Sequence, residues 1–410
     1  MITIVSYSTP TARGINDKDL SISTRVPSAP EVTMRFNQPF TKQSVKRLSA
    51  FNIAAMACMA TVFAISSGTS LADPPPQAKG NPPAQAGPPP DKRKPPLVLE
   101  TAGAMFVGGE TIHADRPCIV AICDPSDGTI RVQHVPAFFM IPATQKHKLP
   151  VVMVPGLGLR EALYMTTTDG REGWAQFFVR RGFAVYTTSQ SNVTAAGFNV
   201  NPFNRAKAGD TTAAEQPELF HWTPEIFWDS FGYGPAFPEV FTGVRFDMDT
   251  DFVPLISGVT PADFSITDEQ RAAGITAVLE KTGPAILITH SQSGPTGFDV
   301  ARARPDLVKA YITIEPIGCP TDEADVAANF ADLPVLSVFG DHIPVRPGWP
   351  ERAAQCATTA AIIEVNGGVA DRIILPDDLG IFGNTHMMMG EDNSDELADF
   401  LVDWIKDNVH

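Results

Sequence analysis

The chain has 410 residues, of which 43% are hydrophobic and 19% charged, so it can bury a large core and is globular rather than disordered. Its formal net charge of −15 makes it a poor partner for nucleic acid, which binds basic surfaces. The same acidity favours solubility and disfavours anionic membranes, but it excludes no class of enzyme.

The N-terminal region predicts an exported protein rather than a folded domain. Basic residues at 42–47 precede an uncharged apolar run from Leu48 to Gly68, which ends in the small-residue sequence Ser70-Leu71-Ala72. This order is typical of a cleaved secretory signal peptide, so residues 1–72 are interpreted as leader and signal peptide. A retained membrane anchor is the alternative, although the run is about as short as a span can be. We therefore expect a periplasmic or secreted protein with no stable membrane insertion after cleavage.

Residues 73–96 are rich in proline and poor in apolar side chains, which predicts an extended linker. The folded domain is then expected to span residues 97–410. Four cysteines follow the predicted signal peptide, namely Cys118, Cys123, Cys319 and Cys356. An even number in an exported protein permits two disulfides of unspecified pairing, and small buried side chains are the alternative. Their spacing fits no zinc pattern, so no metal is expected.

Short runs rich in Val and Ile, bounded by Gly, Pro or Asp, predict buried parallel strands at 150–154, 184–188, 285–289, 310–314 and 334–339. Amphipathic segments alternate with them at 173–181, 297–304 and 394–408. This alternation predicts an α/β protein with a mostly parallel, doubly wound sheet. Upstream, alternating runs at 104–107, 118–122 and 130–135 predict antiparallel strands added at one edge.

A long segment separates the strands predicted at 184–188 and 285–289, far more than a crossover needs. Residues from about 190 to 282 are therefore predicted to form a lid-like insertion. Its middle is rich in aromatic residues, among which Trp222 and Trp228 are candidate substrate-binding residues. The alternative is that these aromatic side chains form the insertion's own core.

The strand at 285–289 runs directly into His290–Gly294, and a helical pattern follows. Strand, tight turn and helix in this order predict a nucleophile elbow of the α/β-hydrolase fold. Thr289 and Ser293 stand where the G-x-S-x-G pattern has glycine. Ser291 is therefore the candidate nucleophile.

A serine hydroxyl becomes a good nucleophile only when a base within hydrogen-bond reach takes its proton, and in this fold the base comes late in the chain. His386 is the candidate base, because His410 is the terminal residue and His290 is expected to give structural support. Two carboxylates could orient the imidazole. Glu315 and Asp341 each follow a predicted strand, at the sheet edge where catalytic groups of α/β proteins gather.

The tetrahedral intermediate of ester hydrolysis needs two backbone N–H donors for its oxyanion. One is expected from Gln292, the residue after the serine, and the other from the loop after the first long strand. That loop reads Pro155-Gly156-Leu157-Gly158, and Leu157 is the candidate donor within it.

With these residues placed, the sequence resembles the esterase 713-like bacterial esterases of the α/β-hydrolase superfamily over roughly residues 103–408. The resemblance is carried by the motifs at Phe106–Gly109, Thr167–Trp174, His290–Gly294, Glu315-Pro316 and Asn384–Met387. It implies that Ser291 is the nucleophile, His386 the base and Glu315, rather than Asp341, the acid. The chain departs from the family at residues 155–158, where the family has His-Gly followed by cysteines.

The sequence thus predicts a carboxylic-ester hydrolase that works through a Ser-His-Glu triad and an acyl-enzyme intermediate. A small-molecule or polymeric ester is the expected substrate, with no metal or organic cofactor. Amide hydrolysis, lactone hydrolysis and perhydrolysis on the same triad are the alternatives. A catalytically inactive envelope binding protein on the same fold is a remote one. The sequence specifies neither the ester nor the oligomeric state.

Overall fold

The computed structural model describes residues 94–114, 128–249 and 252–410. The predicted leader, nearly all of the predicted linker, and the strand expected at 118–122 with Cys118 and Cys123 lie outside these residues. The described part is built on an eight-stranded sheet with the order β1-β2-β4-β3-β7-β8-β9-β10. Its strands are β1 (Leu99–Ala114), β2 (Gly128–Pro142), β3 (Val151–Val154), β4 (Val185–Thr188), β7 (Ala285–His290), β8 (Val308–Ile314), β9 (Val335–Phe339) and β10 (Ala370–Ile374).

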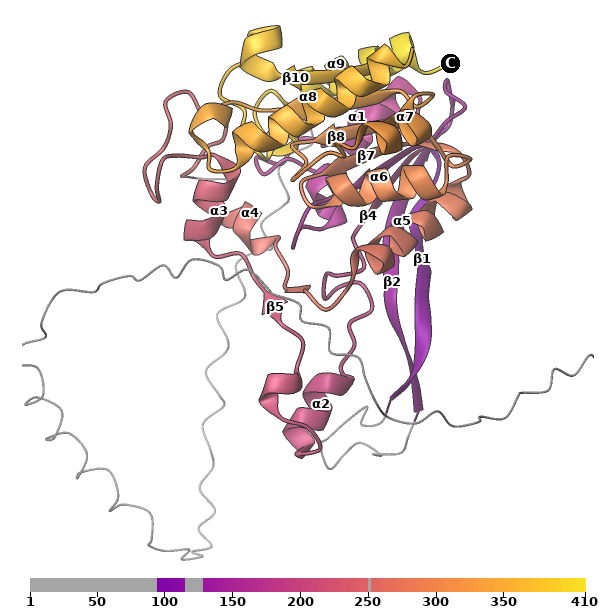
Figure 1. Cartoon of the computed structure of the whole chain (residues 1–410), viewed down its shortest axis with the longest axis vertical. Helices are drawn as coiled ribbons and strands as arrows, with labels where there is room; N and C mark the ends of the chain where they lie inside the picture. Colours follow the sequence, from indigo (N-terminus) through magenta and orange to yellow (C-terminus); the bar gives the residue numbers. More distant parts are fainter. Residues whose placement is uncertain (1–93, 115–127, 250–251) are drawn as a thin grey trace, which may run out of the picture. The chain divides into compact units, whose positions relative to one another are not determined.

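Strands β4, β3, β7, β8, β9 and β10 are parallel to one another, whereas β2 pairs antiparallel with both β4 and the edge strand β1. The predicted fold class is therefore confirmed. Figure 1 shows β1 and β2 side by side as a long twisted hairpin, and β2 pairs with β4 only over Ala137–Met140. Strand β10 was not predicted from the sequence, because Asp371 and Arg372 interrupt the apolar run of this edge strand.

Helices cover both faces of the sheet. Helices α5 (Asp268–Thr282), α6 (Ser293–Ala303), α7 (Glu323–Phe330) and α8 (Trp349–Val365) contribute to the core on one face, and α1 (Trp174–Arg181) and α9 (Ser394–Asn408) to the core on the other. The first four residues of β7 are all apolar because both faces of the strand are covered: Ile286 and Ile288 enter one core, and Ala285 and Leu287 enter the other. Successive side chains of a strand point to opposite faces, so a strand covered on both sides needs no polar positions.

The segment between β4 and β7 contains the predicted insertion. Its elements are α2 (Asn201–Ala208), β5 (Leu219–Phe220), α3 (Pro224–Phe231), α4 (Phe252–Ser257), β6 (Ala262–Asp263) and then α5. Helix α5 starts with a capping box of Thr267 and Gln270 and packs on β1, β2 and α6. It therefore belongs to the helical layer of the sheet. Helix α2 buries none of its residues, and its first residue, Asn201, donates to the His113 carbonyl of β1 at 2.7 Å.

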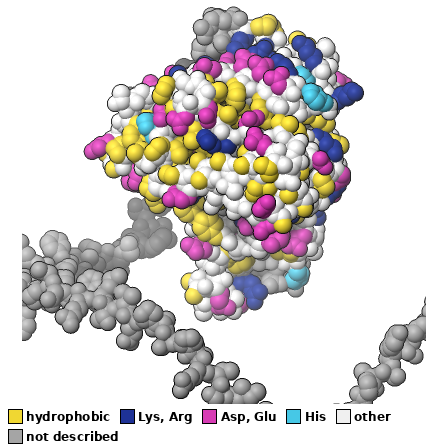
Figure 2. All heavy atoms as spheres, turned by 45° about the horizontal axis from the view of Figure 1, so that its top comes forward, with side chains coloured by type: hydrophobic (Ala, Val, Ile, Leu, Met, Phe, Trp, Pro, Cys, Tyr) yellow, Lys and Arg dark blue, Asp and Glu magenta, His cyan; other side chains and the backbone are white. Residues whose placement is uncertain are grey.

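Short helical turns complete the chain: η1 (Glu161–Tyr164), η2 (Ala213–Glu215), η3 (Ile343–Val345), η4 (Leu375–Leu379) and η5 (Met388–Gly390). In the part of the chain that the structure describes, every helix is too short or too polar to cross a bilayer. Figure 2 shows acidic and basic side chains interspersed with apolar ones over one face of the molecule.

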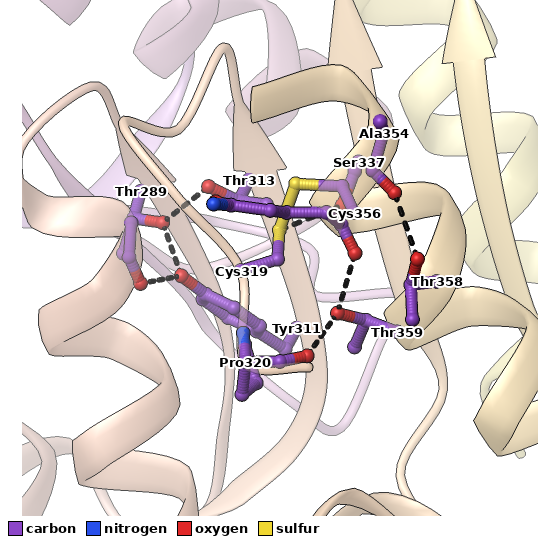
Figure 3. The surroundings of a disulfide bond; sticks show 12 residues. Thr289, Tyr311, Thr313, Cys319, Pro320, Ser337, Ala354, Cys356, Thr358 and Thr359 are labelled. Carbon is purple, nitrogen blue, oxygen red and sulfur yellow. Dashed lines mark hydrogen bonds between the residues drawn. A yellow bond between two sulfur atoms is a disulfide. The ribbon is translucent and has the colours of Figure 1, made fainter. Parts of the chain in front are cut away.

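A disulfide joins Cys319, in the loop after β8, to Cys356 of α8 (Figure 3). Beside it, the Thr359 hydroxyl of α8 donates to the Pro320 carbonyl. The loop that follows β8 is thus fastened to α8 both covalently and by a hydrogen bond. The Cys319–Cys356 disulfide is one of the two that the four cysteines after the predicted signal peptide permit.

Candidate active site

Ser291 occupies the turn between β7 and α6, with a φ of 58°. This left-handed conformation is uncommon for a residue other than glycine, and strain of this kind is typical of functional turns. The Ser293 hydroxyl accepts a hydrogen bond from the His290 N–H at 3.0 Å and lies 3.0 Å from the Val154 carbonyl at the end of β3. Serine at this position therefore fastens the elbow to the neighbouring strand.

The other departure from the glycine pattern is accommodated by β8. The Thr289 hydroxyl lies 2.7 Å from the Tyr311 hydroxyl and 3.1 Å from that of Thr313, as Figure 3 shows. All three side chains are buried, so the larger side chain at 289 is satisfied by its hydrogen bonds.

The loop after β3 lies directly against the elbow. A Cβ atom at Gly156 would stand 2.6 Å from the Ser291 Cβ and 3.1 Å from its Oγ. Any other residue would collide with the serine, so glycine is required for this close approach of the backbone.

A cavity of about 310 Å³ brings together Ser291, His386, Leu157, Gln292 and Trp222, all of which the sequence analysis selected as site residues. The remaining lining residues come from α3, from the loop after β8, and from α8 and the residues just before it: Asp229, Ser230, Phe231, Ile317, Pro347, Trp349 and Arg352. The site therefore lies at the carboxyl ends of the parallel strands, covered in part by the insertion.

Of the two candidate acids, Glu315 contacts the histidine. The His386 Nδ1 donates to Glu315 Oε2 at 2.6 Å, because a carboxylate can only accept. The Asp341 carboxylate accepts instead from the backbone N–H of His342 at 2.6 Å and of Gly383 at 2.8 Å. Asp341 thereby fastens the loop that carries His386 to the end of β9.

The Glu315 carboxylate is fully buried and accepts from two further groups. The Gly340 N–H donates to Oε1 at 2.8 Å, and the Arg346 guanidinium donates to Oε1 and Oε2 at 2.9 and 2.8 Å. Burial alone would raise the pKa of Glu315, but the charge of Arg346 and the contact with His386 hold that pKa well below its ordinary value. The carboxyl group is therefore ionised.

Burial lowers the pKa of His386, and this effect outweighs the contact with Glu315, which raises it. The imidazole is thus neutral at neutral pH, with Nε2 free of a proton when Nδ1 donates to Glu315. His290 lies beside it, with ring centroids 4.3 Å apart, and its Nε2 donates to the His386 carbonyl at 2.9 Å. His290 therefore fixes the backbone of the histidine loop.

Two polar residues that the sequence analysis missed hold Gln292. The Asn192 amide donates to Gln292 Oε1 at 3.2 Å, and the Gln190 amide donates to the same oxygen at 3.4 Å and to the Pro155 carbonyl at 3.0 Å. Both follow β4, and polar residues directly after a parallel strand were the available signal. No acceptor among the described residues takes the backbone N–H of Leu157 or of Gln292.

Glu391 is a second buried carboxyl that the sequence analysis missed. Its two oxygens accept from the Asn384 side-chain amide at 2.5 Å and from the Thr385 N–H at 2.6 Å. No cation pairs with this side chain among the described residues, and burial raises the pKa of Glu391 to about 8. It supports the loop immediately before His386.

The two candidate tryptophans differ in position. Trp222 lines the cavity, and its Nε1 donates to the Leu157 carbonyl at 2.7 Å. Trp228 lies away from the cavity lining, because it is on the buried face of α3, where it packs against Phe237 and Phe252 and donates to the Glu239 carbonyl. These contacts favour the alternative for Trp228, in which it packs in the core of the segment between β4 and β7.

Among residues 94–114, 128–249 and 252–410, no group of three or more His, Cys, Asp or Glu side chains is arranged to hold a metal ion.

The sheet order, the serine at a left-handed turn after β7 and the histidine in the loop before the last helix define an α/β hydrolase. A solved structure of a bacterial esterase matches this chain with a TM-score of 0.73 and 31% sequence identity, covering 77% of this chain and 98% of that one. The chain belongs to the family of this esterase, within the α/β-hydrolase superfamily. The prediction of an enzyme that hydrolyses esters is thereby confirmed.

A probable secreted lipase of a fungus (Fungal sp., strain ATCC 74256) is 27% identical over 316 residues, which cover 65% of this chain and 84% of the lipase. No model of a known protein family matches the sequence.

Proposed function

We propose that the chain is a serine carboxylesterase in which Ser291 is the nucleophile, His386 the general base and Glu315 the acid that orients the base. The observation that carries this proposal is the 2.6 Å hydrogen bond from His386 to the buried, ionised Glu315, behind a cavity that His386 and Ser291 line together. A neutral imidazole held in one tautomer is what a serine hydroxyl needs as its base.

In the proposed reaction His386 Nε2 takes the proton of Ser291 Oγ as that oxygen attacks the ester carbonyl carbon. The carbonyl oxygen becomes an oxyanion and accepts from the N–H groups of Leu157 and Gln292. The alcohol then leaves with the proton from His386, and the acyl group remains on Ser291. Water, deprotonated by the same histidine, attacks the acyl-enzyme and releases the carboxylic acid.

The surroundings of the two N–H groups support their role as donors. The Leu157 carbonyl is held by Trp222, and the Gln292 side chain is held by Asn192, so the peptide segments that carry the donors are fixed before substrate binds. Preorganised donors are usually the largest single contribution in acyl transfer, and removing one typically costs about 10²–10³ in kcat.

Ser291→Ala tests the proposal with p-nitrophenyl acetate and butyrate. The hydroxyl supports chemistry rather than packing, so turnover should fall to less than about a hundredth of wild type without loss of the folded state. Wild-type-like turnover in the folded variant would show that another residue is the nucleophile.

The substrate class follows from the cavity and from the relatives. A cavity of about 310 Å³ that includes Trp222, Phe231 and Trp349 suits a small ester with an apolar acyl or alcohol group. The bacterial esterase and the fungal lipase are both named as ester hydrolases, which supports small-molecule esters as substrates. Activity that rises only with insoluble long-chain or polymeric esters would contradict this assignment.

We also infer that the protein is exported, with residues 1–72 removed, residues 73–96 acting as a linker and the catalytic domain spanning residues 97–410. The fungal relative is named as secreted, and a disulfide between Cys319 and Cys356 persists in oxidising compartments. N-terminal sequencing of protein recovered outside the cytoplasm tests this: a start near residue 73 is expected, and an intact N-terminus would contradict it.

A further inference from the structure

Arg346 is a buried cation directly behind the proposed triad. It follows η3, its side chain is 2% exposed, and it meets both oxygens of the Glu315 carboxylate at 2.9 and 2.8 Å. Its guanidinium also donates to the Ser230 carbonyl of α3 at 3.1 Å and lies 4.0 Å from the centre of the Trp349 ring. A planar fork that meets a carboxylate with two parallel hydrogen bonds fixes the plane of that carboxylate.

We propose that Arg346 is a positioning residue for catalysis: it fixes the Glu315 carboxylate so that Oε2 points at His386, and it fastens this carboxylate to α3 of the insertion through Ser230. The proposal rests on the proposed triad. The backbone of Glu315 is in the left-handed region, with a φ of 40°. Such a strained conformation persists only where the surroundings hold it, so the orientation of the Glu315 carboxylate depends on the groups that bind it.

Glycine at 232 makes room for this arrangement. A Cβ atom there would stand 2.8 Å from Arg346 Nε, and the φ of Gly232 is +78°. The turn that ends α3 therefore lies directly against the guanidinium. The insertion thus contacts the acid of the triad through Arg346, as well as contacting the cavity through Phe231.

The charge of Arg346 also acts on the base. Burial lowers the pKa of His386, the Glu315 carboxylate opposes this, and Arg346 and Arg352 lower it further. The titratable and charged groups around the imidazole among the described residues are Glu315, Arg346, Arg352, His290, Glu391 and, in the cavity lining, Asp229. Removing the charge of Arg346 should therefore raise the pKa of His386, and removing the charge of Glu315 should lower it.

The test is the pH dependence of kcat and kcat/KM for Arg346→Gln, Arg346→Lys and Glu315→Gln. For Arg346→Gln we expect kcat to fall at least about tenfold and the acid limb of the profile to move up by about one pH unit. For Glu315→Gln the same limb should move down. Lysine keeps the charge but cannot form the fork, so Arg346→Lys should lose kcat with its acid limb close to that of wild type.

Arg302→Gln is the matched control, since Arg302 pairs with both oxygens of Asp325 and lies over the Phe330 ring, away from the cavity. It should leave kcat and the limb unchanged. Loss of kcat in Arg346→Gln with no shift of the acid limb would overturn the proposal. Wild-type kcat in Arg346→Lys would overturn it as well, and this variant tests the proposal if Arg346→Gln does not fold. Failure of a fluorophosphonate to label Ser291 in the wild-type protein would instead refute the triad itself.

Discussion

Replacement of Glu315 by glutamine tests the assignment of the acid, with Asp341→Asn as its comparison. Glu315 accepts four hydrogen bonds, from Gly340, from two nitrogens of Arg346 and from His386. Glutamine has one acceptor oxygen, and its NH₂ group would face donors. The change removes the negative charge that holds the imidazole tautomer and stabilises the imidazolium in the transition state.

The magnitudes follow from these contacts. Turnover of Glu315→Gln should fall on the order of a thousandfold or more, as for other triad acids. Arg346 would be left as a buried cation without its partner, which typically costs about 3–5 kcal/mol of the free energy of unfolding. Asp341 accepts only backbone N–H bonds at a half-buried position, so Asp341→Asn should cost about 1 kcal/mol and less than about tenfold in turnover.

The assay is kcat with p-nitrophenyl acetate, together with urea unfolding of both variants and circular dichroism to verify that each is folded. The reverse ranking of the two turnover losses in folded proteins would return the acid to Asp341. Equal losses in both would show that the two carboxylates support the histidine loop jointly.

Four other substitutions test the roles given to single side chains. Trp222→Ala should alter the preference among acyl chain lengths, because this side chain lines the cavity. Trp228→Ala should instead lower the free energy of unfolding by about 3–5 kcal/mol, because it deletes a large buried side chain. Equal effects of the two substitutions on chain-length preference and on stability would contradict their different positions. Burial raises the pKa of Glu391 to about 8, so at intermediate pH the folded protein holds a proton that the unfolded chain releases. The free energy of unfolding of wild type, relative to that of Glu391→Gln, should therefore fall as pH rises from about 5 to about 8. A pH-independent difference between the two proteins would show that Glu391 is ionised. Cys356→Ala removes the disulfide to Cys319, which closes a loop across a sequence separation of 37 residues. The free energy of unfolding in chemical denaturation should fall by about 3–4 kcal/mol, with esterase activity retained. An unchanged denaturation midpoint would argue against the disulfide.

The turn that carries Ser291 was predictable from the sequence, because a buried strand followed by a tight turn and a helix is a local pattern. His386 was predictable as the candidate base from its position near the C-terminus. The acid was not fixed in this way: Glu315 and Asp341 both follow strands, and only the resemblance favoured Glu315. Their roles are distinguished by the loop at 383–386, which brings the Gly383 N–H to Asp341 and the imidazole to Glu315.

Arg346 had no sequence signal, because arginines are mostly exposed and its partner lies 31 residues earlier in the chain. Trp222 and Trp228 lie in one aromatic segment, and the start of α3 at Pro224 separates them: one precedes the helix beside the cavity, and the other lies on its buried face. These are tertiary features, and neither periodicity nor composition could predict them.

The central claim is that Ser291 is the activated nucleophile, and covalent labelling tests it most directly. The wild-type protein is incubated with a fluorophosphonate, and the modified peptide is identified by mass spectrometry. One adduct on Ser291 is expected, with none in Ser291→Ala and a rate at least about a hundredfold slower in His386→Ala, since only a serine with its base reacts readily. An adduct on another serine, or labelling of Ser291→Ala at the wild-type rate, would contradict the account.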